Sequence, residues 1–383
     1  DRKRADLRPR RPSRSRSRRA ADHHVCGAGL SAVPKNRLRQ RAAKRPRYER
    51  YELADSPWTK KLTQRDLAVL LGTTKDRLEA LVRDHENYVH RRDENIKGKL
   101  RKLAIPRGKL RAVHERLKGH LNKIKQPPYL YSPRKGRGQR DNAFLHASSA
   151  QVLKVDISQF YPQTTVEDIW RWAHYTVGMR EDVAGLFAKL VAIDRKMPFG
   201  SPISPVLTSL IHRPMFDRVY QLVREAGFEM SLYVDDLTIS GQGITGEFLA
   251  AVRSEIRSGG FNTHKIEFLE AARPVVITGV PIAGKRVLAP TALHQRLRRS
   301  YADLKSARSD KERAEVIDQI LIALGTYRHF VGASSDEGRK AANRMHALKQ
   351  RRRNLSIELV TMPTVDFVPT ATLSPAAPGV PWA

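Results

Sequence analysis

The sequence has little cysteine, few acids for its length and no long apolar run, and each shortage excludes a class of protein. Cys26 is the only cysteine among 383 residues, so a disulfide framework and a cysteine-based zinc site are both excluded. No apolar run approaches the roughly 18 residues of a spanning helix, and no amphipathic anchor stands out. We therefore expect a protein of a reducing cytoplasm, with no signal peptide and no membrane partner.

The shortage of acids leaves a strongly basic chain. The sequence has 71 Lys and Arg against 39 Asp and Glu, a formal net charge of +32 and a pI of about 10.7. Such a balance favours a polyanionic partner, above all nucleic acid, with an anionic membrane surface as the competing interpretation. The length allows two or three subdomains with a sizeable core.

The two ends of the chain differ in composition from the middle. Residues 1–50 hold 18 Lys and Arg against four acids with almost no apolar periodicity, which predicts a basic, disordered tail over residues 1–55. Contacts of such a tail with phosphates are mostly nonspecific. Residues 359–383 are rich in Pro, Ala and Thr, which predicts a flexible second tail. The folded part therefore lies between them.

Two short helices are predicted in residues 62–82. Thr63 can cap the first, Gly72 ends it, and Thr73 or Thr74 can cap the second. The spacing also resembles a helix-turn-helix DNA reader. A basic strand or loop around Arg101 follows, and after Pro106 a helix is predicted with four apolar residues on one face: Leu110, Val113, Leu117 and Leu121.

The stretch SLYVDDLTIS, residues 231–240, sets two adjacent acids between two short apolar runs. The pattern predicts a tight hairpin with Asp235 and Asp236 at its tip. Because like charges repel, the pair requires either full solvation or a bound cation. Upstream, QVLKVDISQFYP predicts a strand that ends at Asp156, where the acid is either a helix cap or ion-pair partner, or a metal ligand.

The order of the elements around these acids predicts a split βαβ sheet. After the Asp156 strand, a Gly/Pro/Ser loop leads into an amphipathic helix that carries apolar residues from Leu207 to Val223 and is bent at Pro214. The hairpin, a helix over residues 248–258 and a final strand, PVVITGVPI, follow. In this order the end of the Asp156 strand lies beside the hairpin tip.

Taken together and in order, these blocks resemble a bacterial retron-type reverse transcriptase, an RNA-directed DNA polymerase. The resemblance covers residues 60 to 350. The matching residues are Asn142, Ala143 and His146 before the acid strand; Asp156 and Tyr161; Gly200, Ser201, Pro202, Ser204 and Pro205; Tyr233, Asp235 and Asp236; Lys265; and Ile277, Thr278 and Gly279. The chain departs from the family at Phe199, which stands where Gln is usual, at the loop YSPRKGRGQ, and at Val234, which stands where Ala is common.

The resemblance implies an α+β right-hand polymerase. Its parts would be helical and basic fingers over residues 56–140, a split βαβ (ferredoxin-like) palm over 141–287 and a helical thumb over 288–358, flanked by the two disordered tails. Within the thumb, Ser309 and Glu312 form the pattern of a capping box before an apolar helix.

The resemblance also implies roles for individual residues. Two Mg²⁺ ions, with Mn²⁺ as an alternative, would be held by Asp156, Asp235, Asp236 and Ile157. Lys265 would protonate or neutralise the leaving pyrophosphate, and Arg101 would grip the triphosphate or a template phosphate. The remaining roles are nucleotide binding by Tyr161, Phe199, Gly200 and Ser201, with Tyr161 excluding a 2′-hydroxyl; bracing by Asn142, His146, Tyr233, Thr278 and Gly279; and RNA binding by Arg296, Arg298 and Arg299.

The implied function is RNA-templated DNA synthesis from dNTPs on a dedicated structured RNA, giving a cDNA product. An effector protein and phage defence belong to the same expectation. Two alternatives stay open: a defence-associated or intron-derived reverse transcriptase with another template or primer, and a non-catalytic helix-turn-helix or basic RNA-binding protein.

Overall fold

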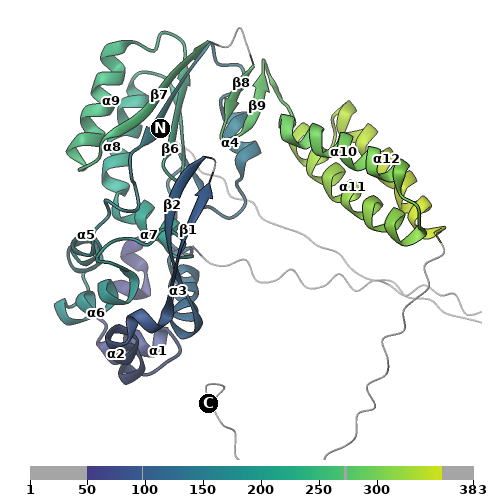
Figure 1. The fold of residues 1–383 in the computed structure, drawn as a ribbon. Coiled ribbons are helices and arrows are strands. Elements are labelled where there is room, and N and C mark those ends of the chain that lie inside the picture. The colour runs from purple at the N-terminus through teal and green to yellow at the C-terminus, as the bar shows by residue number, and fades with distance from the viewer. Residues whose placement is uncertain (1–49, 97, 271–273, 356–383) are drawn as a thin grey trace, which may run out of the picture. The chain divides into compact units, whose positions relative to one another are not determined.

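A computed structural model describes residues 50–96, 98–270 and 274–355 (Figure 1). Residues 1–49 of the tail predicted over 1–55, and the Pro-rich tail predicted over 359–383, lie outside the described residues. Structure begins inside the range predicted as the first tail, because Tyr51 forms a bridge to Ile124 and a 3₁₀ turn follows directly, η1 Leu53–Asp55.

Helices and strands alternate irregularly along the chain, which confirms the predicted α+β class. The strands are β1 Val89–Ile96, β2 Lys99–Pro106, β3 Leu130–Ser132, β4 Gln151–Ile157, β5 Glu229–Tyr233, β6 Asp236–Gly241, β7 Thr263–Glu270, β8 Val275–Ile277, β9 Val280–Ala283 and β10 Arg286–Val287. The helices are η2 Pro57–Thr59, α1 Gln64–Leu70, α2 Lys75–Arg83, η3 His85–Tyr88, α3 Gly108–Leu121, α4 Gln139–Leu145, α5 Val166–Arg171, η4 Trp172–Thr176, α6 Glu181–Val191, α7 Ser204–Ile211, α8 Arg213–Glu225, α9 Gly246–Ser258, α10 Thr291–Ser306, α11 Asp310–Val331 and α12 Asp336–Arg353.

A five-stranded sheet, called here the central sheet, has the strand order β3-β5-β6-β4-β7. β3 runs parallel to β5, and the other neighbours are antiparallel. Successive side chains of a strand point to opposite faces of the sheet, so β4 and β6 each contribute alternate residues to both faces. Leu153, Val155, Leu237 and Ile239 pack with α8 and α9 in one apolar cluster, and Figure 1 shows both helices along the same side of β6 and β7. On the other face, Lys154 and Asp156 follow Val152, which packs with Ala143 of α4 in a separate apolar cluster.

A second apolar cluster joins the first helices to a later part of the chain. Trp58 and leucines of α1, α2 and α3 share it with α6 and α7. The cluster therefore combines residues from the range predicted as fingers with residues 181–211, which fall in the range predicted as palm. Conversely, β3 belongs to the central sheet although it lies before residue 141. The chain thus crosses between the two cores more than once.

The predicted helix boundaries in the first part are confirmed by capping. Thr63 accepts a hydrogen bond from Asp66 N at the start of α1, and Thr74 accepts one from Arg77 N at the start of α2. These side chains satisfy backbone donors that a helix start leaves without a partner. The strand ending at Pro106 and the helix after it are also confirmed, with the four predicted apolar residues of α3 buried.

Two predicted elements were wrong in detail. The final strand of the central sheet is β7, not PVVITGVPI, which instead forms the β8–β9 hairpin of a separate three-stranded sheet. Thr278 and Gly279 form the two-residue turn of that hairpin, both with positive φ, and so end the strand after only three residues. The single helix predicted to carry Leu207 to Val223 is two helices divided at His212, with Pro214 tolerated in the first turn of α8.

The last three helices pack on one another through their own apolar cluster, which includes Leu304, Ile317, Ile320 and Leu348. The predicted capping box is confirmed: Ser309 accepts from Glu312 N, and the Glu312 carboxylate accepts from Ser309 N. Among the described helices, none is both long enough and apolar enough to cross a membrane.

Candidate active site

Three carboxylates meet where β4 and the β5–β6 hairpin lie side by side. Asp156 of β4 is the register partner of Asp236 at the start of β6, and Asp235 lies in the two-residue tip between β5 and β6. One carboxylate oxygen from each of the three residues lies within 4.8 Å of the others. The grouping expected from the sequence is therefore present in the structure.

The hairpin tip is held in an unusual backbone conformation. Val234 has φ +64°, a region that is strained for a β-branched residue. Hydrogen bonds hold the tip from both neighbouring strands: Val234 N donates to Ser132 O at 3.1 Å, and Ile157 N donates to Asp235 O at 3.2 Å. The strained tip therefore presents Asp235 to the two other acids.

The charges of the three acids act on one another. Burial and, after it, the Asp236 and Asp156 carboxylates together raise the pKa of Asp235 to about 6, against the opposing effect of Arg101. A cluster of hard oxygen donors with this excess of negative charge fits divalent cations such as Mg²⁺. The side chain of Ile157 is buried and apolar, so a metal could be coordinated there only by the backbone carbonyl.

Arg101, Phe199 and Tyr161 form a row beside the acids. The Arg101 guanidinium lies over the Phe199 ring, 5.3 Å from its centroid, and the Phe199 and Tyr161 rings meet edge to face at 5.6 Å. Arg101 lowers the pKa of Asp235, while burial and, after it, Asp235 raise the pKa of Tyr161. The structure therefore gathers three of the five residues predicted to bind the nucleotide near Asp235, with the Arg101 guanidinium stacked on Phe199.

The loop that carries Phe199 is tied closely to β2. Ala104 N donates to Phe199 O at 2.9 Å, and Gly200 has φ +120° with Ile105 so near that a Cβ at Gly200 would come within 2.9 Å of it. Ser201 is buried, and its hydroxyl lies 2.7 Å from Nδ1 of His114 on α3. Only glycine fits at position 200, so the loop and β2 hold a fixed spacing.

Tyr161, rather than the adjacent Phe160, faces the acids. Phe160 is buried among His212, Phe216 and Phe261. Tyr161 is only half-buried, and its contact with Phe199 lies next to Asp235. Of the two aromatic residues, Tyr161 is therefore the one that a bound sugar could touch.

Lys265 belongs to an ion-pair row on the polar face of the central sheet. Glu267 accepts from Lys265 Nζ and from Lys154 Nζ, each at 2.7 Å. The Glu267 carboxylate raises the pKa of the Lys265 ammonium, with smaller contributions from Asp156 and Asp236. All of these residues line a cavity of about 290 Å³. Lys265 is therefore a charged lysine beside the acids.

His146 lies behind the hairpin and connects its two strands. The ring is fully buried, with Nδ1 at 2.8 Å from Ser240 Oγ of β6 and Nε2 at 2.7 Å from Ser231 Oγ of β5. Burial lowers the pKa of His146 to about 3, so the ring is neutral at physiological pH. It braces the hairpin and does not reach the acids.

Asn142 braces a different hairpin. Its Nδ2 donates to Thr278 Oγ1 at 3.3 Å, so the two predicted family motifs, Asn142 on α4 and Thr278 and Gly279 in the β8–β9 turn, contact each other. Tyr233 is the register partner of Asp236 and lines the cavity beside the acids. These residues therefore surround the site.

The three arginines predicted to bind RNA do not share one surface. Arg298 lines a cavity between α10 and α12, and Arg296 and Arg299 do not. All three are exposed. Positions one and two residues apart do not face the same way on a helix, which is the reason for the separation.

Glu267 and His114 are among the residues of the site that the sequence reasoning missed. Glu267 is two residues from Lys265 and therefore on the same face of β7, a signal that could have identified it. His114 gives no such signal, because its partners are Ser201 and the Leu190 carbonyl, both far away in the sequence.

The sequence of the chain is similar to those of known reverse transcriptases. Residues 89–282 match the family model described as reverse transcriptase (RNA-dependent DNA polymerase). The chain is 27% identical over 177 residues to the retron Se72 reverse transcriptase of Salmonella heidelberg (strain 579083-10), covering 45% of this chain and 47% of the relative.

Two further relatives carry similar names. The chain is 26% identical over 128 residues to the retron Ec86 reverse transcriptase of Escherichia coli, covering 33% of this chain and 40% of the relative. It is 26% identical over 248 residues to the retron Mx65 reverse transcriptase of Myxococcus xanthus, covering 57% and 58%. The chain thus spans about half the length of the curated relatives it matches.

Burial of Asp235 and the repulsion among the acids predict a stability difference between wild type and Asp235→Asn without divalent cations. Because the pKa of Asp235 is raised in the folded state, ionisation of its carboxyl group lowers the stability of wild type above pH 6. This loss of stability disappears as the pH falls toward 4. The variant should therefore be more stable than wild type by at most about 3 kcal/mol at pH 8. Mg²⁺ should raise the melting temperature of wild type and not of the variant.

The measurement is thermal unfolding in chelator and in Mg²⁺ at pH 8 and pH 4.5. Glu315→Gln, which removes an exposed acid of α11, is the matched control and should retain the Mg²⁺ effect. Equal Mg²⁺ shifts in wild type and Asp235→Asn would contradict a metal site at this position.

Burial of His146 predicts a loss of stability in mild acid. The unfolded ring takes up a proton near pH 6.5, while the folded ring stays neutral down to about pH 3, so stability is full above pH 6.5 and falls between these values. At pH 5 the loss amounts to about 2 kcal/mol. His146→Gln should reduce the difference between urea unfolding at pH 7.5 and pH 5 by this amount. His294→Gln controls for removing an imidazole, and an unchanged difference in His146→Gln would refute the assignment.

Proposed function

The chain belongs to the reverse transcriptase (RNA-dependent DNA polymerase) family, and from this premise we propose that it extends DNA on an RNA template. The observation that supports the proposal most strongly is the meeting of Asp156, Asp235 and Asp236, whose oxygens lie within 4.8 Å of one another, next to Arg101. In this proposal the central sheet with α8 and α9 is the palm, the cluster around α1, α2, α3 and α6 belongs to the fingers, and α10–α12 form the thumb.

Each residue near the acids has a role in joining a nucleotide to a hydroxyl. Asp156 and Asp235 hold two Mg²⁺ ions, with Asp236 and the Ile157 carbonyl as further ligands. When bound, the ions stabilise the attacking and leaving oxygens of an in-line displacement at phosphorus. Arg101, held over Phe199, binds the triphosphate through charge-assisted hydrogen bonds.

Lys265 and Tyr161 act at opposite ends of the nucleotide. Lys265 is kept protonated by Glu267 and can donate a proton to the departing pyrophosphate. Tyr161, half-buried against Phe199, lies under the sugar, where its ring leaves no room for a 2′-hydroxyl. The row of Tyr161, Phe199 and Arg101 thus positions the nucleotide from sugar to phosphate.

We propose a structured RNA as template and primer, as in a retron. The support is the names of the relatives, which are retron reverse transcriptases, and the net charge of +32, which attracts phosphates. An effector protein and a role in phage defence are parts of the same proposal. A DNA reader built on α1 and α2 gains no support, because both helices bury leucines in the fingers core.

The first test replaces a metal ligand without changing its shape. Asp156→Asn and Asp235→Asn should each lower DNA synthesis by at least about a hundredfold, because the lost charge stabilises only the bound ions and the developing transition state. Incorporation of labelled dTTP on poly(rA) primed with oligo(dT) measures the effect, and Glu315→Gln is the control. A folded Asp235→Asn protein with wild-type incorporation would exclude this mechanism.

The second test concerns the residue that departs from the family pattern. If Phe199 holds Arg101 toward the triphosphate, Phe199→Leu should raise the KM for dNTPs by roughly two- to thirtyfold, the range that follows from a cation–π energy of about 0.5–2 kcal/mol. Phe199→Trp keeps an aromatic face and should restore the KM. If both variants lower kcat equally and leave the KM unchanged, Phe199 only supports the fold.

A further inference from the structure

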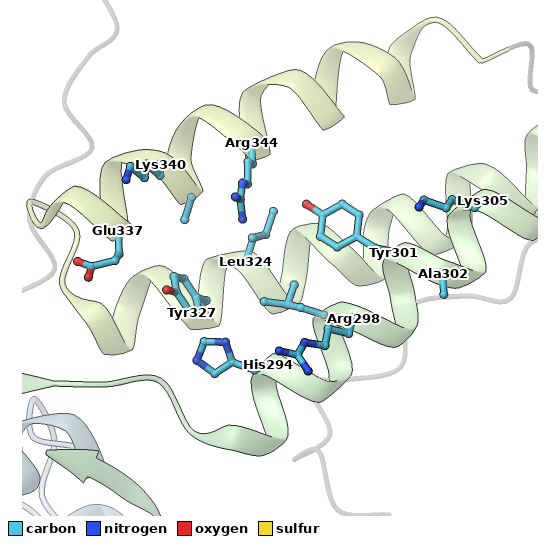
Figure 2. Close-up of a pocket in the computed structure, with 12 residues that line it drawn as sticks. His294, Arg298, Tyr301, Ala302, Lys305, Leu324, Tyr327, Glu337, Lys340 and Arg344 are labelled. Carbon is cyan, nitrogen blue, oxygen red and sulfur yellow. The ribbon is translucent and has the colours of Figure 1, made fainter. Parts of the chain in front are cut away.

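A cavity of about 500 Å³ lies among the last three helices, apart from the acids. Figure 2 shows side chains of α10, α11 and α12 pointing into it. α10 contributes residues at helical spacing, among them Arg298, Tyr301 and Lys305, and α12 contributes Lys340 and Arg344. Because these positions repeat every three or four residues, each helix presents one continuous stripe to the cavity.

The cavity, called here the thumb groove, has an apolar floor and aromatic walls. Leu324 of α11 and Ala341 of α12 are buried at its base. Tyr301 and Tyr327 are half-buried in its walls, and the His294 ring meets the Tyr327 ring edge to face at 5.4 Å. Two half-exposed tyrosines on an apolar floor can stack against a flat ring.

The rim of the thumb groove is basic. Arg298, Lys305, Lys340 and Arg344 are all exposed, and Figure 2 shows Arg344 and the ring of Tyr301 reaching into the space from opposite helices. The acid of the lining, Glu337, lies 3.6 Å from the guanidinium of Arg286, which offsets its charge. The groove therefore combines stacking surfaces with an excess of positive charge.

We propose that the thumb groove binds one unpaired nucleotide of an RNA, with the base stacked on Tyr301 or Tyr327 and the flanking phosphates on the basic rim. Aromatic stacking together with cations is the way proteins hold unpaired bases. The volume lies within the roughly 300–1,000 Å³ of pockets that take whole small molecules. A base inside a duplex cannot enter, because its faces are covered by its neighbours.

This inference deepens the proposed function and rests on it only for the source of the RNA. It gives Arg298 a different task from Arg296 and Arg299. Arg298 binds beside the inserted nucleotide, whereas the two arginines outside the groove are free to contact the backbone of any RNA, paired or unpaired. An RNA with a bulge or loop next to a stem would engage both surfaces together.

The experiment uses the full chain and a short RNA that carries one 4-thiouridine, either as a single strand or annealed to its complement. Ultraviolet irradiation followed by mass spectrometry locates the adducts, so binding elsewhere on the basic chain does not obscure the result. We expect the single strand to label Tyr301 or Tyr327 and the duplex to leave both unlabelled.

Four variants refine the test, with the RNA concentration for half-maximal labelling of Tyr327 as the readout. Tyr301→Leu should raise it about tenfold, within the range for loss of one stacked base, and Tyr301→Phe, which keeps the ring, should not. Arg344→Gln should also raise it. Arg299→Gln removes the same charge outside the groove and should weaken single strand and duplex equally in a titration of total RNA binding.

Three results would overturn the inference: equal labelling of the groove by duplex and single strand, an unchanged midpoint in Tyr301→Leu, or RNA adducts only outside the groove. RNA adducts only outside the groove would indicate that the groove binds a protein segment and not RNA. Synthesis on poly(rA) with oligo(dT) is measured in parallel. If wild type makes no DNA while the groove is labelled, the proposed polymerase function fails and the RNA site stands.

Discussion

The mutual repulsion of three carboxylates is the constraint on which the rest of the site depends. Asp156 and Asp236 face each other across two paired strands, and Asp235 joins them from the hairpin tip. Burial and its two neighbours raise the pKa of Asp235 to about 6. Folding therefore brings together negative charges that lie far apart in the unfolded chain. The fold can keep such an arrangement only if its backbone is fixed from outside and a cation compensates the charge.

The supports around the hairpin meet the first requirement. His146 joins β5 to β6 through Ser231 and Ser240 on the polar face. Ile157 and Val234 donate backbone hydrogen bonds that fix the tip from β4 and toward β3. α8 and α9 cover the opposite face with an apolar core. Each support acts on the position of the acids, and none of them needs to contact a substrate.

Local patterns predicted much of this arrangement from the sequence. The adjacent acids between two apolar runs predicted the β5–β6 hairpin, and the acid at the end of an apolar run predicted β4. Thr63, Thr74 and Ser309 gave helix starts, because a cap acts within three residues of its own position. What local patterns could not predict are the pairings over long distances, such as His114 with Ser201, and the choice of β7 over the PVVITGVPI segment for the sheet edge. Which of the two segments pairs with β4 is decided by tertiary packing, and the residues of either segment do not reveal it.

The most direct test of the central claim, that the three acids bind the cations of nucleotide transfer, is an anomalous difference map. Crystals of the chain with an RNA template, a DNA primer and a non-hydrolysable dNTP analogue would be grown in Mn²⁺. The account predicts two peaks about 3.5–4 Å apart, bridged by Asp156 and Asp235, with the triphosphate reaching Arg101. A bound nucleotide with no peak at these carboxylates would contradict it.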